Sequence, residues 1–175
     1  KTVGNPEFMK AGYEAQLRTV VMLKNHNKTL PLQKQVKVYI PKRHIPGGRN
    51  WFGQDIPERW VDPVNSAILE KYFTVVDNPR DADAAIVVID SPDGGAGYDR
   101  SDLEKGGNGY VPITLQYPPY RADYARETSI AGGSPFETFT NRSYRDKEAT
   151  ARNSNDMQMV VDTKAAMADK PVIVV

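Results

Sequence analysis

The 175-residue sequence contains no cysteine and only two histidines, His26 and His44. The absence of cysteine excludes disulfides, thiolate nucleophiles and cysteine-ligated zinc or iron–sulfur centres. Two histidines cannot supply a three-histidine metal site, and no G-x-S-x-G motif marks a Ser-His-Asp hydrolase. We therefore expect neither a metal nor another cofactor.

Excess charge and long apolar runs are also lacking. The 23 Lys and Arg nearly balance the 22 Asp and Glu, which leaves a net charge of +1. This balance gives no basic footprint for nucleic acid or for an anionic membrane. No apolar run approaches the roughly 20 residues that span a bilayer, and the first residues lack the apolar run of a signal peptide. We expect no nucleic-acid partner and no membrane partner.

Alternating helix and strand patterns are present instead. The spacing of apolar residues predicts a helix that begins at Pro6, is capped by Asn5 and ends near Val20–Lys24. Further helices are predicted over 63–72, capped by Asp62, and from Asn153 or Ser154 to the residue before Pro171. Strands are predicted over 36–40, 73–76, 84–89 and 171–175. The last two strands are continuously apolar, which indicates burial on both faces.

This order predicts an α/β fold, a three-layer αβα sandwich with a mainly parallel sheet. Residues 41–62 are expected to form a loop with aromatic anchors. Residues 91–154 lack periodicity and are expected to form a long loop insertion, which is usually functional in a compact domain. The chain stops on Val175 within its most hydrophobic strand, so we expect residues 1–175 to be a partial, truncated domain.

Four segments in this order resemble the second domain of family 3 glycoside hydrolases. They are Thr19–Asn25 with Leu30-Pro31-Leu32, then Ala82–Ile89, Gly97–Leu103 and Lys170–Val175. The resemblance implies a two-domain enzyme in which a barrel precedes an αβα sandwich and the active site lies between them. Residues 1–175 would then be part of the C-terminal sandwich, and the catalytic barrel is absent from this chain.

The resemblance further implies a retaining, exo-acting β-glycosidase, most simply a β-glucosidase, that hydrolyses terminal β-linked sugars. Its partners would be a β-linked oligosaccharide or glucoside and the N-terminal barrel domain, which would carry the aspartate nucleophile. This domain would supply loops to the cleft and would be inactive alone. By family resemblance only, we expect a periplasmic or extracellular location. The alternative is a non-catalytic α/β module that binds carbohydrate or a protein partner through its 91–154 loop.

The position of the family's acid/base glutamate is occupied by Ala96 in this sequence. A methyl group cannot donate a proton, so another carboxyl group or the partner domain must serve. The candidates are Glu127 and, second, Glu137, both on the long loop. In the alternative interpretation both are ordinary solvated glutamates, with Glu127 paired to Arg126 or Arg121.

Substrate-binding candidates are Tyr98, Asp99, Arg100 and Trp51. Aromatic rings can stack on the C–H faces of sugars, and acidic and basic groups can bind sugar hydroxyls. Equally, the rings could pin loops to protein surfaces, and the Asp99–Arg100 pair could be a turn salt bridge. The Gly94–Gly97 run lacks the G-x-G-x-x-G and Walker patterns. We expect it to allow a close backbone approach rather than nucleotide binding.

Overall fold

The computed structural model describes the chain apart from residues 1, 34, 50–51, 125–126 and 131–140. The chain forms two compact units, residues 1–33 and residues 34–175. Within the described ranges, no helix combines the length and the apolar character that crossing a membrane requires.

Helix α1 (Pro6–Thr19) is the main element of the first unit and confirms the first predicted helix. The Asn5 side chain caps it, since Oδ1 accepts a hydrogen bond of 2.8 Å from the Glu7 amide. Pro6 begins the helix, where its missing N–H costs nothing. None of the residues of α1 is buried. A short 3-10 helix, η1 (His26–Lys28), follows it.

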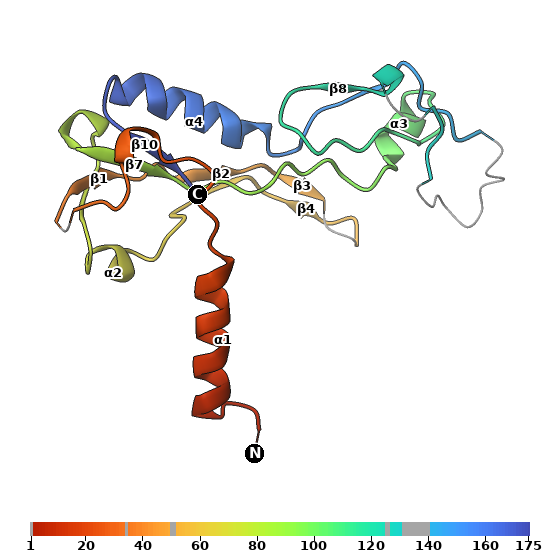
Figure 1. The fold of residues 1–175 in the computed structure, drawn as a ribbon. Coiled ribbons are helices and arrows are strands. Elements are labelled where there is room, and N and C mark those ends of the chain that lie inside the picture. Colours follow the sequence, from red (N-terminus) through yellow and green to blue (C-terminus); the bar gives the residue numbers. More distant parts are fainter. Residues whose placement is uncertain (1, 34, 50–51, 125–126, 131–140) are drawn as a thin grey trace. The chain divides into compact units, whose positions relative to one another are not determined.

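A parallel sheet forms the centre of the second unit (Figure 1). Its strands lie in the order β10-β7-β1-β6, and each neighbouring pair is parallel. Their bounds are β1 (Lys37–Tyr39), β6 (Thr74–Val76), β7 (Ala84–Val87) and β10 (Val172–Val174). All of the predicted strands are present, which confirms the α/β class and the mainly parallel sheet.

The core lies between the sheet and helix α4 (Ser154–Met167). Tyr39, Ala85 and Val172 stand in register across three adjacent strands and pack with Met167 from the helix. Figure 1 shows α4 on one side of the sheet and the short helix α2 (Ser66–Leu69) on the other. The central strand β7 is largely buried, as its apolar sequence predicts.

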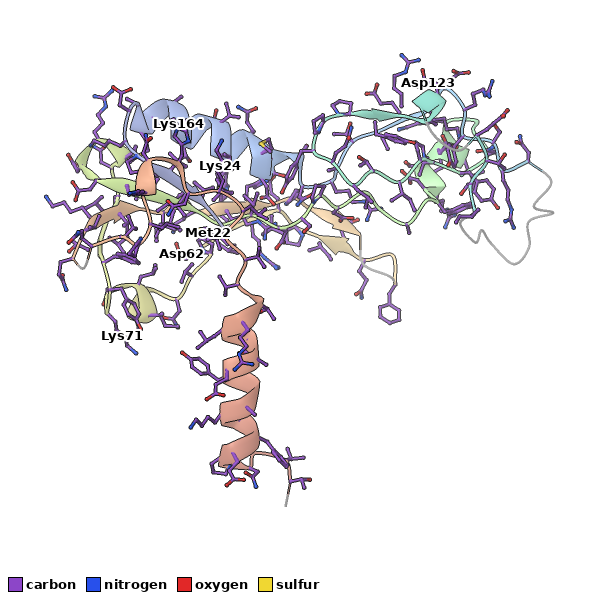
Figure 2. The ribbon with its side chains drawn as sticks, in the orientation of Figure 1. Met22, Lys24, Asp62, Lys71, Asp123 and Lys164 are labelled. Atoms are coloured by element: carbon purple, nitrogen blue, oxygen red, sulfur yellow. The ribbon has the colours of Figure 1, made fainter. Side chains whose placement is uncertain are left out.

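Two lysines fasten the turn between α4 and β10. Lys164, labelled in Figure 2, donates hydrogen bonds to the carbonyls of Ala168 and Lys170 at 2.7 and 3.3 Å. Lys170 donates to the carbonyls of Arg80 and Ala82, both at 2.7 Å. These bonds satisfy carbonyls of the turn that follows the helix and tie this turn to η2 (Pro79–Asp81), which precedes β7.

Three predictions need correction. Helix α2 spans only four residues, because the Asn65 side chain, not Asp62, caps it by accepting from the Ala67 amide at 2.9 Å. Strand β10 lies at a sheet edge, so Val174 is 47% exposed rather than buried on both faces. Residues 41–62 contain two small antiparallel pairs, β2 (Arg43–Ile45) with β5 (Arg59–Val61) and β3 (Gly48–Arg49) with β4 (Asp55–Ile56).

The predicted insertion connects β7 to α4. It contains short elements that the sequence does not reveal: α3 (Arg100–Glu104), β8 (Tyr120–Arg121), the 3-10 helix η3 (Ala122–Tyr124) and β9 (Glu148–Ala149). Strands β8 and β9 pair antiparallel. Most of the described part of the insertion is irregular chain that side-chain hydrogen bonds hold in place.

Candidate functional site

The strand order reverses between β1 and β7. From β1 the chain adds β6 on one side, and then β7 and β10 on the other. In open parallel sheets, ligands usually bind outside the carboxyl ends of the strands at such a switch point. The insertion leaves the sheet at this edge, directly after β7.

A buried ion pair lies beside this edge. The Arg43 guanidinium binds both carboxylate oxygens of Asp156, with Nε–Oδ1 at 2.9 Å and Nη2–Oδ2 at 2.8 Å. The Asp156 side chain is 0% exposed, and Arg43 Nη1 also lies 2.6 Å from Asp90 Oδ2. The hydrogen bond to Asp156 raises the pKa of Arg43, although burial opposes the rise. This geometry is the bidentate fork for which arginine is suited.

Asn153 joins the two ends of the insertion. Its Oδ1 accepts from the Asp93 amide at 2.8 Å, and its Nδ2 donates to the Ser91 carbonyl at 3.1 Å and to Asp156 Oδ2 at 3.0 Å. The Arg152 amide donates to the Asp93 carbonyl at 2.8 Å. Asn153 was predicted as a helix cap and does occupy that position, but its side chain binds the insertion instead of the first helical amides.

Tyr117 extends this network into the insertion. Its hydroxyl donates to the Asp90 carbonyl. Burial raises the pKa of Tyr117, and the negative charge of Asp156 adds to the rise. The Asp90 side chain is 70% exposed, so its carboxylate is the part of the network that a ligand can reach. We conclude that this network positions loops, since two carboxylates already occupy the Arg43 guanidinium.

The glycine run, Gly94–Gly97, packs against another part of the insertion at Gly94. A Cβ atom built on Gly94 would lie 1.9 Å from the backbone oxygen of Thr114, so only glycine fits there. This confirms the predicted close backbone approach, and the neighbour is the insertion's own backbone.

A second cluster holds the far part of the insertion. Lys147 Nζ lies 2.7 Å from Asp102 Oδ2, from Asn108 Oδ1 and from the Tyr110 carbonyl oxygen. The Gly109 amide donates to the same Asp102 oxygen at 2.8 Å. Burial works to raise the pKa of Asp102, but the hydrogen bonds from Lys147 and Gly109 lower it overall.

Acid should therefore loosen this cluster. Because the pKa of Asp102 is depressed in the folded state, its ionised form stabilises the fold above the ordinary aspartate range, and the contribution is lost as pH falls through the folded pKa. We expect Asp102→Asn to lower the urea midpoint at pH 7 and the difference from the unsubstituted chain to shrink towards pH 2.5. Asp123→Asn is the control, since Asp123, labelled in Figure 2, has a looser ion pair with Arg121 at 3.5 Å. A difference that stays constant with pH would contradict the assignment.

The predicted substrate-binding residues lie at the start of α3. Tyr98 packs edge-on against Tyr110, with ring centroids 5.7 Å apart. Asp99 caps α3 by accepting from the Ser101 amide at 2.9 Å, and Arg100 pairs with Glu104 at 4.0 Å. The predicted Asp99–Arg100 pair is therefore replaced by two local contacts. Trp51 lies outside the described residues.

Glu127 carries an ion pair, but with a different arginine from the two predicted. Its Oε2 lies 3.0 Å from Arg145 Nη2, and its side chain is 61% exposed. Arg121 pairs with Asp123 instead, and Arg126 lies outside the described residues. Glu137, the second candidate, also lies outside them. Among the described residues, no three His, Asp or Glu side chains gather as a metal-binding group.

Sequence reasoning missed Arg43, Asp90 and Asp156. Two signals could have found them. Arg43 follows the first strand and Asp90 follows the third, and the carboxyl ends of parallel strands meet at one edge. Asp156 lies in the first turn of the final helix, where an acidic residue is common.

A curated relative is similar to part of the chain. It is the protein named "Probable beta-glucosidase C" of Aspergillus flavus, which is 27% identical over 93 residues. The match covers 53% of this chain and 12% of that protein. No family model matches the chain, and no solved structure matches it either. The relation therefore rests on this partial similarity.

Proposed function

We propose that this chain is part of a retaining, exo-acting β-glycosidase, most simply a β-glucosidase. The similarity to the Aspergillus flavus protein carries the proposal, because that protein's name describes a β-glucosidase. The parallel sheet supports it, with an insertion that leaves from the edge where ligands of such sheets usually bind. The chain would be the first part of a C-terminal sandwich domain that follows a catalytic barrel. The location outside the cytoplasm stays a prediction.

In this proposal the insertion contributes to a cleft whose nucleophile belongs to the barrel. Retention requires two carboxyl groups about 5–5.5 Å apart, one as nucleophile and one as proton donor. Ala96, exposed between Gly95 and Gly97, supplies no carboxyl group. The donor would be Glu127 or Glu137, and Tyr98, Asp99, Arg100 and Trp51 would contact the sugar. Because small displacements of such groups slow reactions strongly, the Arg43 and Lys147 clusters would act by positioning the insertion.

The second candidate function is a non-catalytic module that binds carbohydrate or a protein partner through residues 91–154. The ion pair of Glu127 with Arg145 favours it, since a mostly exposed glutamate that is paired at 3.0 Å is an ordinary surface contact. Ala96 favours it as well, because the family's glutamate is absent there.

One assay of the full-length protein separates these functions. A retaining β-glycosidase hydrolyses 4-nitrophenyl β-glucoside and releases the β-anomer first, which proton NMR detects before mutarotation. We expect this result from the full-length protein and no turnover from residues 1–175 alone. Release of the α-anomer, or no hydrolysis of any β-glycoside by the folded full-length protein, would overturn the proposal. Saturable binding of glucans through residues 91–154, without hydrolysis, would favour the module.

A further inference from the structure

A groove lies between α4 and the β2–β5 pair, apart from the insertion. Its volume is about 600 Å³, within the range of about 300–1,000 Å³ that is usual for small-ligand sites. Side chains from both elements line it, notably Lys42, His44 and Trp60 on the strand side and Asn155, Gln158 and Asp162 on the helix side.

An aromatic surface forms the strand side of the groove. His44 and Trp60 are directly opposite each other in the β2–β5 register, and their ring centroids are 4.9 Å apart. His44 Nε2 lies 3.1 Å from Glu58 Oε2, which fixes the imidazole beside the indole. Trp60 is nevertheless 67% exposed. Covering a large, exposed apolar ring that is already held in place removes apolar surface from water, and this favours ligand binding.

A polar row forms the helix side. Asn155, Gln158 and Asp162 are spaced by three and four residues and therefore share one face of α4. Asn155 Nδ2 donates to the His44 carbonyl at 2.8 Å, and Gln158 Nε2 donates to Asp162 Oδ1 at 2.8 Å. Among the described residues, no hydrogen bond engages the amide oxygens of Asn155 and Gln158 or the second carboxylate oxygen of Asp162. These oxygens are acceptors for ligand hydroxyl groups.

The charges of the groove select against ionic ligands. Lys42 is its cationic side chain, and it already lies 3.6 Å from Asp62. Asp162 is its anionic side chain. With one charge of each sign, the groove attracts neither a phosphate nor a cation strongly. A fitting ligand is neutral, has an apolar face for the indole and carries several hydroxyl groups.

We propose that this groove binds a neutral saccharide, one pyranose face stacking on Trp60 and its hydroxyls donating to the row on α4. None of the residues that line the groove belongs to the insertion or to the residues assigned to the cleft of the proposed function. The inference rests on the proposed function only for the choice of probe, a β-linked gluco-oligosaccharide. Binding here needs no proton donor and no barrel.

The test is a titration of the 175-residue chain, which has two tryptophans, with cellotriose. Calorimetry gives the affinity of each variant, and NMR of the indole N–H signals of the unsubstituted chain shows which tryptophan the sugar covers. We expect a saturable shift of the Trp60 signal, about tenfold weaker binding in Trp60→Ala and near-normal binding in Trp60→Phe. Glucose 6-phosphate should not bind more tightly than glucose. Unfolding midpoints check that the variants remain folded.

Trp51→Ala is the matched control, because Trp51 is the tryptophan assigned to the proposed cleft. Loss of binding in Trp51→Ala with unchanged binding in Trp60→Ala would overturn the groove and leave the proposed function standing. A titration without a Trp60 shift would also overturn the groove. Conversely, if cellotriose binds the groove but the full-length protein hydrolyses no glycoside, the groove proposal stands and the proposed function fails.

Discussion

Replacing Arg43 by methionine should lower the free energy of unfolding by about 3–5 kcal/mol. The reason is that Asp156 would lose its ion-pair partner. Asp156 is 0% exposed, and the guanidinium supplies two of its hydrogen bonds at 2.8 and 2.9 Å. Without Arg43 a buried carboxyl group loses its counter-ion and two of its hydrogen bonds, which is among the most costly changes in a protein interior. Urea unfolding followed by circular dichroism measures the loss.

Three further variants separate this explanation from a general loss of packing. Lys42→Met removes an exposed partner of Asp62, 3.6 Å away with both side chains more than half exposed, and should change stability by less than about 0.5 kcal/mol. Arg43→Lys should be intermediate, because lysine cannot form the fork. The double variant Arg43→Met with Asp156→Leu should recover part of the loss. Equal losses in Arg43→Met and Lys42→Met would contradict the buried ion pair.

Replacing Glu127 by glutamine in the full-length protein should lower kcat for β-glucoside hydrolysis at least about 100-fold, while the protein still folds. Glutamine keeps the size of the side chain but cannot donate the proton that the leaving group needs. Activity should fall least for substrates with good leaving groups, since these need little protonation. Steady-state rates with an alkyl and a nitrophenyl glucoside measure both effects.

The control for this variant is Glu148→Gln, an exposed glutamate on β9 in the same insertion. It should retain full turnover. Arg145→Met tests whether the ion pair at 3.0 Å positions Glu127. It should lower kcat by a smaller factor than Glu127→Gln does. Unchanged turnover in Glu127→Gln would exclude Glu127 and leave Glu137 or the barrel.

The sheet could be predicted from the sequence because its signal is local. Residues 84–87 are continuously apolar and become the buried strand β7. The length of helix α2 was overestimated because apolar spacing does not show that the Asn65 side chain would take the cap position. The exposure of Val174 depends on which strand lies next to β10, and no local pattern encodes that neighbour.

The candidate site was harder to predict because it depends on contacts between distant residues. Arg43 and Asp156 are 113 positions apart, and their fork forms only after β1, β2 and α4 have taken their places. Lys147 reaches Asp102 across 45 positions. Sequence patterns located the insertion and predicted Tyr98, Asp99 and Arg100 as site residues within it, which stays a prediction, but they could not identify the residues that hold the insertion in place.

The meeting of residues 91–93 with residues 152–153 has a consequence for how such a protein can change over time. Asn153 holds the two ends of the insertion close together. Because the ends are close, the insertion can be lengthened, shortened or exchanged without altering the strands of the sheet. Natural variation can thus change the length and the side chains of the insertion, while residues 91–93, residues 152–153 and the sheet keep their sequence constraints.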